Sequence, residues 1–282
     1  TSIFPTVDVP SGSGSSLASS YDLSSFMPPI RNQGSQGSCV GFCISYLKSY
    51  HERLEKGYTY TNNDKIMSPA FVYNKAKEPG SCGSGTYTIN ALNLIRDVGI
   101  CTENEFPYNV NNCTNQPSQS ITQNAYRNRI RQWAGFDFIN KSNSTILNEM
   151  KYYINQMQPI VIDMHVDDNF SRLGFNTSNE ATWTTNFSSY IGYHCLLIVG
   201  YDDNKNAFKV WNSWGTDWGN DGWIWIDYNM FFRNVSKAFV TWDVFDNTPN
   251  PTSSISITGN LNYGNVQINN STYSNITVKN TG

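Results

Sequence analysis

The sequence predicts an α+β protein with two lobes, and three features support this prediction. Helical patterns fill the chain up to about residue 115. Short β-branched and aromatic runs, separated by turn residues, follow from about 116 to 245. Hydrophobic residues make up 39% of the 282 residues, which is enough to bury a sizeable core. Because the helices come first and the strands later, we expect a helical lobe followed by a strand-rich lobe.

The helical lobe is expected to hold three helices. Segment 39–56 carries apolar residues at helical spacing, and Gly57 is expected to cap its end. Ser68 and Pro69 predict the start of the second helix, because serine accepts hydrogen bonds from free N–H groups and proline suits the first helical position. The third helix is predicted in TINALNLIRDVGI.

The strand-rich lobe is predicted from five runs of β-branched and aromatic residues. Turn residues separate these runs, as expected for short strands. One further helix is predicted at 144–157, with Ser144 as its N-cap. The five runs are YRNRIRQWAGFDFI, PIVIDMHV, YHCLLIVGYDD, AFKVWNSWG and GWIWIDY.

Both ends of the chain differ from these lobes. Residues 1–20 are rich in Ser, Gly and Pro, and we expect an N-terminal extension or a propeptide remnant. Two prolines among Asn and Thr predict a linker at 246–252. Residues 253–282 alternate polar and apolar side chains with Gly-Asn turn signals, which resembles the start of a bacterial immunoglobulin-like β module. About thirty residues are too few to close a sandwich, so we expect a partial β-sandwich tail of a longer protein.

Composition excludes several classes of function. Charged residues are sparse at 15%, and the net charge of −3 gives no nucleic-acid footprint. No run of 18 apolar residues occurs, so no membrane span is expected. The six cysteines form no CxxC pair, so no structural zinc is expected. Abundant aromatic residues, Asn, Ser and Thr favour a secreted or cell-surface protein, whose signal peptide was either removed or never present.

Cys39 is the candidate nucleophile. Acyl transfer by a thiol needs a thiolate, a general base, a group that orients this base and an oxyanion donor. Cys39 lies in the first turn of a predicted helix, where free N–H groups and the helix dipole lower a thiol pKa. Gln33 can donate its amide to the same place as the Cys39 N–H. His194 opens a buried strand, and Asn212 begins the turn after the next strand, so a hairpin would bring the two together.

Three motifs together resemble the papain family of cysteine peptidases. QGSQGSCV is similar to the family's Q-G-x-C-G-S-C-W, HCLLIVGY to H-A-x-x-x-V-G-Y, and WNSWGTDWGNDGW to K-N-S-W-G-x-x-W-G-x-x-G-[YW]. The resemblance covers about residues 21–245, and the motifs occur in the right order. It implies a papain-like two-lobe fold, with a helical lobe at about 21–115, a β-barrel-like lobe at about 116–245, and the active-site cleft between them.

The resemblance also implies a cysteine endopeptidase that works through a thioester and needs no cofactor or metal. Cys39 would attack, His194 would shuttle the proton, Asn212 would hold the imidazole, and Gln33 would complete the oxyanion hole with the Cys39 N–H. The expected partner is a peptide or protein substrate, bound by a monomer that the β tail could tether to a cell surface. Trp214 would cover the Asn–His pair and also contact the substrate. The implied substrate contacts are Gly37, Ser38, Gly85, Thr86, Tyr87, Asp163, Gly192, Tyr193, Cys195 and Trp214.

Three positions depart from the family pattern. Gln36 replaces a cysteine, so the family's disulfide across the active-site loop cannot form. Val40 replaces the tryptophan after the nucleophile, as in some bacterial relatives. Gly85 and Thr86 take the place of paired glycines whose backbone pairs with substrate. Thr86 can still offer its N–H and C=O if its backbone is not forced to positive φ.

The remaining thiols and histidines are expected to lie outside the chemistry. Cys43 and Cys195 are expected to be buried free thiols, as small hydrophobic residues. The other three cysteines allow one disulfide at most, and Cys101–Cys113 is favoured over Cys82–Cys113. We expect His51 at the surface near the end of the first helix, and His165 solvated or at a strand edge.

The sequence is compatible with more than one substrate preference and reaction type. If Asp163 points into the pocket, it should favour Lys or Arg two residues before the cut; otherwise it faces solvent. An inserted loop at 165–193 would fit an exopeptidase, and a transpeptidase is possible on the same scaffold. A non-catalytic binding protein also fits the sequence, as does a peptidase whose cleft is occluded by residues 1–20.

Overall fold

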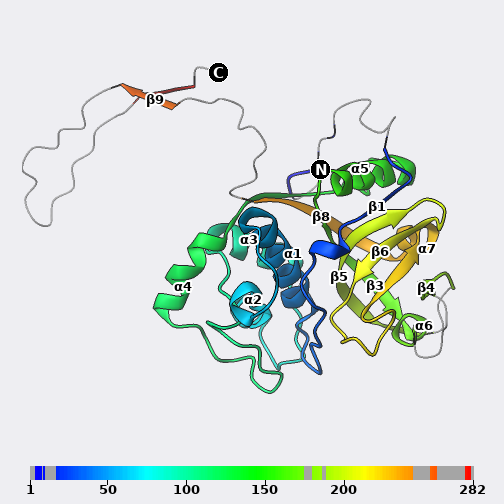
Figure 1. Ribbon diagram of the computed structural model, residues 1–282, viewed down its shortest axis with the longest axis horizontal. Coiled ribbons are helices and arrows are strands. Elements are labelled where there is room, and N and C mark those ends of the chain that lie inside the picture. Colours follow the sequence, from blue (N-terminus) through cyan, green and yellow to red (C-terminus); the bar gives the residue numbers. More distant parts are fainter. Residues whose placement is uncertain are drawn as a thin grey trace, which may run out of the picture. The chain divides into compact units, whose positions relative to one another are not determined.

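A computed structural model describes residues 4–7, 9, 17–174, 180–185 and 189–243, together with the backbone of strands 255–258 and 277–280 (Figure 1). The chain divides into two units, Thr1–Val244 and Phe245–Gly282. In the second unit, strands β9 (Ile255–Thr258) and β10 (Thr277–Asn280) pair antiparallel. The predicted linker lies outside the described residues.

The first half of unit 1 holds the three predicted helices and a fourth helix, α4, that was not predicted. Helix α1 ends at Gly57, whose φ of 65° is the left-handed conformation of a glycine cap. Helix α2 begins after Ser68, whose Oγ accepts the Phe71 N–H at 3.0 Å. The helices are α1 (Cys39–Lys56), α2 (Pro69–Ala76), α3 (Thr88–Asp97) and α4 (Gln119–Ala125), with 3-10 turns at Ser24–Phe26, Asn63–Lys65 and Tyr126–Asn128. Helix α1 packs against both α2 and α3.

The second half forms a sheet of eight strands in the order β2-β8-β3-β5-β6-β7-β4, with β1 paired to β5. Its strands confirm the five predicted runs. They are β1 (Ser20–Asp22), β2 (Ile130–Gly135), β3 (Ile160–Asp167), β4 (Thr182–Trp183), β5 (Tyr190–Asp202), β6 (Ala207–Trp211), β7 (Trp223–Asp227) and β8 (Val235–Asp243). Helices α5 (Asn143–Asn155), α6 (Asp168–Ser171) and α7 (Tyr228–Asn234) belong to this half. The two-lobe α+β architecture is thus as predicted (Figure 1).

The N-terminal residues that the structure describes lie on the sheet. Phe4 packs against the rings of Trp133 and Phe239, with centroids 6.2 and 5.5 Å away. Gly135 exchanges main-chain hydrogen bonds with Pro5 and Val7, and a Cβ at this glycine would lie 2.1 Å from the Phe4 ring. These contacts hold residues 4–7 on β2 and β8.

A buried ion network connects the two halves. Lys48 of α1 donates to Glu52 and to Asp243 of β8, each at 2.5 Å, and its side chain is 1% exposed. His51, one turn further along α1, is also buried, and its Nε2 lies 3.2 Å from Thr241 Oγ1. The predicted surface position of His51 is therefore wrong, because the β8 strand covers this face of α1.

Two local predictions are also corrected. The disulfide joins Cys82 and Cys113, whose Cα atoms are 5.5 Å apart, whereas Cys101 is a buried free thiol. The fourth predicted helix begins one residue earlier than expected. Ser142 rather than Ser144 caps it, because the Ser142 Oγ accepts the Thr145 N–H.

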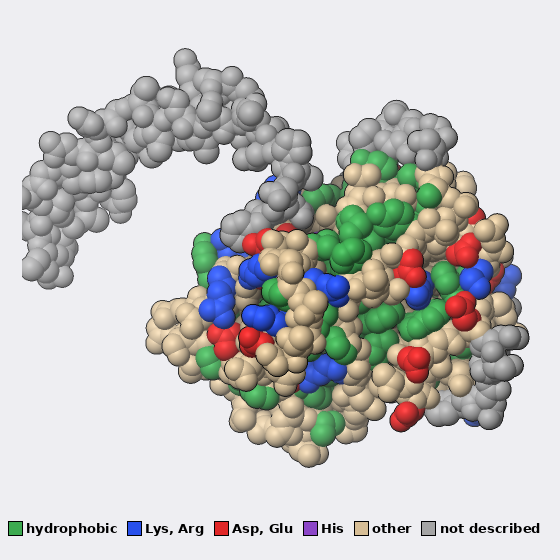
Figure 2. Space-filling model, in the orientation of Figure 1, with side chains coloured by type: hydrophobic (Ala, Val, Ile, Leu, Met, Phe, Trp, Pro, Cys, Tyr) green, Lys and Arg blue, Asp and Glu red, His purple; other side chains and the backbone are tan. Residues whose placement is uncertain are grey.

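The surface agrees with the sparse, mixed charge of the sequence. In the view of Figure 2, basic and acidic side chains are interspersed rather than gathered into a patch of one sign. None of the helices in the described part of the chain has the length and apolar character needed to cross a membrane.

Candidate active site

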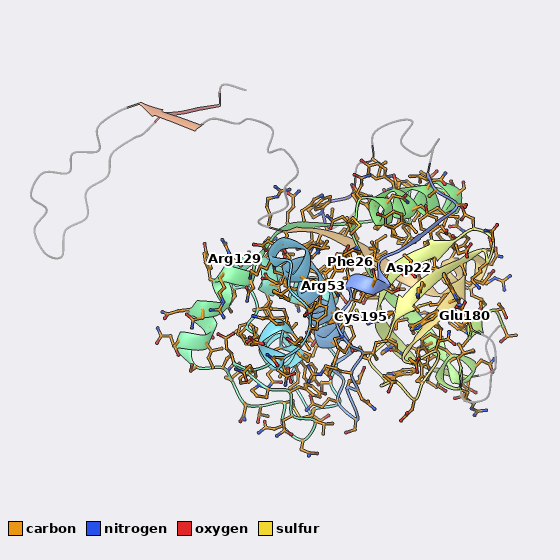
Figure 3. All side chains as sticks on the ribbon, in the orientation of Figure 1. Asp22, Phe26, Arg53, Arg129, Glu180 and Cys195 are labelled. Atoms are coloured by element: carbon orange, nitrogen blue, oxygen red, sulfur yellow. A yellow bond between two sulfur atoms is a disulfide. The ribbon has the colours of Figure 1, made fainter. Side chains whose placement is uncertain are left out.

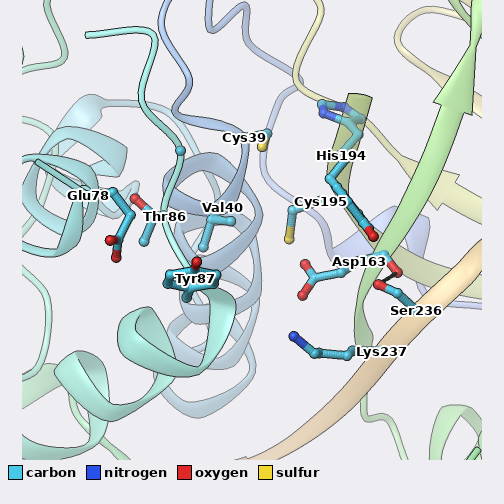
Figure 4. A pocket seen from close by; sticks show the side chains of 12 residues that line it. Cys39, Val40, Glu78, Thr86, Tyr87, Asp163, His194, Cys195, Ser236 and Lys237 are labelled. Carbon is cyan, nitrogen blue, oxygen red and sulfur yellow. Dashed lines mark hydrogen bonds between the residues drawn. The ribbon is translucent and has the colours of Figure 1, made fainter. Parts of the chain in front are cut away.

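A pocket of about 540 Å³ lies where the start of α1 faces strands β3, β5 and β8 (Figure 4). Cys39 and Val40 enter it from α1, Asp163 from β3, and His194 and Cys195 from β5. Figure 3 places Cys195 between the helices and the sheet. The remaining lining residues are Glu78, Gly85, Thr86, Tyr87, Tyr193, Ser236 and Lys237.

The β5–β6 hairpin brings His194 and Asn212 together. In this hairpin Leu197 is opposite Trp211. Asn212, which follows Trp211, therefore lies near His194, where the buried part of β5 starts. His194 Nε2 is 2.6 Å from Asn212 Oδ1. Because this amide oxygen can only accept, Nε2 carries the proton and Nδ1 is left without one. Asn212 is held in turn by the Ser213 N–H, which donates to the same Oδ1 at 2.7 Å.

Aromatic rings cover the histidine. The Trp214 ring lies 4.6 Å from that of His194, and Phe170 packs against Trp214 with centroids 5.4 Å apart. His194 is 5% exposed and Asn212 is 1% exposed, so their hydrogen bond is shielded from water. This shielding strengthens the bond and fixes the orientation of the imidazole.

Gln33 is fastened beside this pair. Its Oε1 accepts the Ser213 hydroxyl at 2.7 Å, and its main-chain N–H donates to the Ser213 carbonyl at 2.8 Å. Its Nε2 donates one hydrogen to the Gln36 carbonyl at 2.8 Å. The amide is therefore held with its NH₂ end on the side of the Cys39 loop, and a second Nε2 hydrogen remains to donate.

The loop before Cys39 approaches a second loop closely. The Gly37 N–H donates to the Cys82 carbonyl at 2.9 Å. A Cβ on Gly37 would lie 2.6 Å from the Gly83 carbonyl oxygen, so only glycine fits this approach. The disulfide from Cys82 to Cys113 fixes this second loop.

Hydrogen bonds replace the missing disulfide at Gln36. Its buried side chain donates from Nε2 to the Asn109 carbonyl at 2.7 Å. Ser38, the N-cap position of α1, is also buried, and its Oγ lies 2.8 Å from the Tyr108 hydroxyl. The same Tyr108 hydroxyl donates to the Gln33 carbonyl at 2.6 Å. Residues 33–38 are thus held in one position without the family's disulfide.

The electrostatics of the pair depend on burial. Desolvation raises the pKa of the Cys39 thiol to about 11, although the main-chain N–H groups of Cys195 and Val40 favour the thiolate. Desolvation lowers the pKa of His194 to about 4, although the hydrogen bond that its ring donates to Asn212 favours the protonated form. At a pH between these two pKa values, the Cys39 sulfur and the His194 Nδ1 together hold one proton, which can lie on either atom.

The predicted substrate-contact residues are distributed over four places. Gly85, Thr86, Tyr87, Asp163, Tyr193 and Cys195 line the pocket. Gly37 and Ser38 lie in the loop that leads to Cys39, and Gly192 lies on β5 opposite Val166. Trp214 lies over His194 rather than in the pocket wall. His165 is half-buried, and its ring lies 4.3 Å from that of Tyr193.

Asp163 lies inside the pocket rather than in solvent. Its Oδ1 accepts the Thr88 hydroxyl at 2.6 Å. Burial raises the pKa of Asp163, while Thr88, Lys237 and Cys195 act in the opposite direction. Lys237 is the β8 residue opposite Asp163 in the sheet, and Figure 4 shows both side chains on the pocket side.

Several pocket and supporting residues were missed from the sequence. Ser213 fixes Gln33 and could have been found from its place in the NSW motif. Lys237 and Glu78 carry charges in the pocket wall, but no local signal marks them. A possible metal-ligand group in the described part of the chain, Glu52 with Glu55 and Asp243, is already occupied by the Lys48 ammonium.

Comparison with known families agrees with this geometry. A model of the papain family of cysteine proteases matches residues 17–239, which is most of the chain. The chain belongs to the papain family of cysteine proteases. The members of this family are hydrolases, and the papain-family match includes the Gln33, Cys39, His194 and Asn212 positions.

The chain is similar in sequence to proteins from two different organisms. "Gamete and mating-type specific protein A" of Dictyostelium discoideum is 28% identical over 210 residues, which are 72% of this chain and 41% of that protein. "Cysteine protease" of Blomia tropicalis is 25% identical over 217 residues, which are 76% of this chain and 61% of that protein. The chain therefore spans less than two thirds of the length of these two curated relatives.

Solved structures share the fold. Xylellain, a cysteine protease from Xylella fastidiosa, has a TM-score of 0.71 at 20% identity and covers 86% of this chain and 92% of its own. The Carica candamarcensis cysteine protease CMS1MS2 has a TM-score of 0.59 at 19% identity and covers 80% and 99%. At these identities the likeness concerns the papain-like fold.

Proposed function

We propose that this chain is a cysteine endopeptidase that hydrolyses peptide bonds through a Cys39 thioester. The observation that carries the proposal is the buried 2.6 Å hydrogen bond from His194 Nε2 to Asn212 Oδ1, beside a pocket that also holds Cys39. This bond leaves Nδ1 of the imidazole free to exchange a proton with the thiol. A thiol, an oriented imidazole and fixed amide donors are the parts that acyl transfer requires.

The reaction follows from these positions. Cys39 gives its proton to His194 Nδ1, and its sulfur attacks the peptide carbonyl. The Cys39 N–H and the free hydrogen of Gln33 Nε2 stabilise the oxyanion. His194 then protonates the nitrogen of the leaving amine, the amine departs, and the acyl group stays on Cys39 as a thioester. A water molecule gives a proton to the same nitrogen, attacks the thioester and releases the acid and the free thiol.

The pH profile is the first testable consequence. The pair should lose activity when it takes up a second proton, which burial delays by lowering the pKa of His194 to about 4. The acid limb of kcat/KM is therefore expected near pH 4, well below the ordinary histidine value of about 6.5. Initial rates in a constant-ionic-strength buffer series measure this limb. A limb near the ordinary value would contradict a desolvated imidazole.

Substrates with blocked ends test the endopeptidase assignment. An internally quenched peptide with an acetylated N-terminus and an amidated C-terminus should be cleaved as fast as its unblocked form. An exopeptidase would instead need one free end and would cleave only the corresponding singly blocked peptide. Aminolysis products in the presence of an added amine would indicate transpeptidation.

The pocket is proposed to bind the side chain two residues before the cut, through Tyr87, Asp163 and Cys195. Gly85 and Thr86 would pair with the substrate backbone. Further substrate contacts are proposed for Tyr193 in the pocket wall and for four residues outside it, Gly37, Ser38, Gly192 and Trp214. Lys237 faces Asp163 across β3 and β8, so its charge compensates the carboxylate. We therefore expect the pocket to prefer an uncharged side chain, in place of the basic preference that Asp163 alone would give.

Removing either Lys237 or Asp163 should leave the charge of the other residue uncompensated in the pocket. In Lys237→Met, the ratio of kcat/KM for Arg over Leu at this position should rise about 5-fold, as expected for a partly solvated pair worth about 1 kcal/mol. In Asp163→Asn, the same ratio should fall and that for Glu over Leu should rise. A matched peptide series measures both. Unchanged ratios in Lys237→Met would show that Lys237 does not act on the bound side chain.

We also propose the subtype of the enzyme, its location and the role of its C-terminal segment. Val40 after the nucleophile and the likeness to xylellain support a bacterial-type member. The Cys82–Cys113 disulfide supports a secreted or cell-surface location, because disulfides persist in oxidising compartments. The β9–β10 pair supports a downstream immunoglobulin-like module that tethers the enzyme.

A further inference from the structure

Three thiols lie together beside the pocket. Cys43 is one turn after Cys39 on α1, and Cys195 lies on β5, which packs against α1. The Cys195 main-chain N–H donates a hydrogen bond to the Cys39 sulfur. The Cys195 thiol lies against the Cys43 thiol and against Asp163. Figure 4 shows the Cys39 and Cys195 side chains on facing elements of the pocket.

Peptide hydrolysis uses only one of these thiols. Cys195 is 2% exposed, yet it forms part of the wall of the same pocket as Cys39. Cys43 is equally buried but does not line the pocket. Cys195 is therefore the free thiol placed to react with a modified Cys39.

We propose that Cys195 is a resolving thiol, which captures Cys39 as a Cys39–Cys195 disulfide after a hydroperoxide has oxidised Cys39. Without such a partner, a sulfenic acid in an open pocket is oxidised further to the sulfinic acid, which is irreversible. The disulfide removes the nucleophile, joins α1 to β5 across the cleft and is reversed by a thiol reductant.

The chemistry balances with hydrogen peroxide as the oxidant. Cys39 gives its proton to His194, and its sulfur attacks one peroxide oxygen, so that an S–O bond forms and the O–O bond breaks. The departing hydroxide takes this proton from His194 and leaves as water. The Cys195 sulfur then attacks the sulfenic sulfur. The S–S bond forms, the S–O bond breaks, and the hydroxyl leaves as water with the Cys195 proton. Two thiols and one peroxide give one disulfide and two water molecules.

Access and the neighbouring imidazole assign the order of these steps, because burial raises the pKa of both Cys39 and Cys195. Cys39 is partly exposed and shares its pocket with His194, which can take the thiol proton, so oxidation begins there. Cys195 is 2% exposed and lies against the Cys43 thiol, and a protonated, buried thiol reacts slowly with peroxide. This inference rests on the proposed reactivity of Cys39, but not on peptide hydrolysis.

Peroxide treatment of the whole chain followed by peptide mapping tests the proposal. The sample is quenched in acid, alkylated and digested without reduction. The wild type should yield a cross-linked pair of peptides that contain Cys39 and Cys195, lighter by two hydrogens than their sum. Peptidase activity, measured against each protein's own untreated rate, should return with a thiol reductant. Untreated protein with the same reductant controls for effects on the native disulfide.

Two alanine variants decide the assignment. In Cys195→Ala, Cys39 should appear as the sulfinic acid, and the reductant should not restore activity. Cys43→Ala is the matched control, because it removes a buried thiol from the same cluster and should keep both the cross-link and the recovery. Sulfinic Cys39 in the wild type at the rate of Cys195→Ala would overturn the proposal. The peptide map decides this even if the chain proves to have no peptidase activity.

Discussion

Cys39→Ser is expected to lower kcat/KM by about 10⁴-fold or more, with the fold and substrate affinity retained. The hydroxyl replaces the thiol at nearly the same volume. Its proton is far harder for a single imidazole to remove, because its pKa lies well above that of a thiol. Steady-state kinetics on a fluorogenic peptide measure the loss, and circular dichroism checks the fold.

Cys43→Ser is the matched control for this change. It makes the same replacement one helical turn away, at a thiol that does not line the pocket. Its activity should stay within about 10-fold of the wild type, because any loss comes from core packing rather than from the reaction. A comparable loss in both variants would remove the special role of Cys39.

Lys48→Met is expected to lower the free energy of unfolding by about 3–5 kcal/mol, the cost of breaking a buried ion pair from one side. Lys48 lies between Glu52 and Asp243 and binds both carboxylates at 2.5 Å. Its removal leaves two acidic groups close together in a low-dielectric interior. Denaturant unfolding, with an unchanged m-value, measures the difference.

Lys56→Met provides the comparison for Lys48→Met. Lys56 also binds Glu52, but its side chain is 45% exposed. Solvent screens that pair, so its loss should cost about 1 kcal/mol or less. Equal effects of the two substitutions would show that the network does not connect α1 to β8 as the structure indicates.

Four helices, α1, α2, α3 and α5, and the catalytic motifs could be predicted from the sequence because their signals are local, whereas α4, α6 and α7 were not predicted. Gly57 and Ser68 act within one turn of their own helices, and the structure shows both caps. Ser144 failed as a cap because two serines stand at the start of the same helix. Only the path of the chain decides that the Ser142 hydroxyl reaches the Thr145 N–H.

The errors concern contacts between segments far apart in the chain. The pairing of Cys82 with Cys113 depends on where two loops meet, which spacing cannot specify. His51 was predicted at the surface, but β8, which is far away in the sequence, covers it. The position of Lys237 opposite Asp163 depends on the register between β3 and β8, so the pocket's charge could not be read from Asp163 alone.

Alkylation of the native protein tests the central claim most directly. A limiting amount of iodoacetamide at about pH 6, followed by peptide mass mapping, reports which thiol can pass its proton to a neighbouring base, because a thiol without such a base is almost wholly protonated there and reacts slowly. The account predicts selective labelling of Cys39 over Cys43, Cys101 and Cys195, and its loss in His194→Ala. Equal labelling of Cys39 and the other free thiols, or labelling that survives His194→Ala, would contradict a working Cys39–His194 pair.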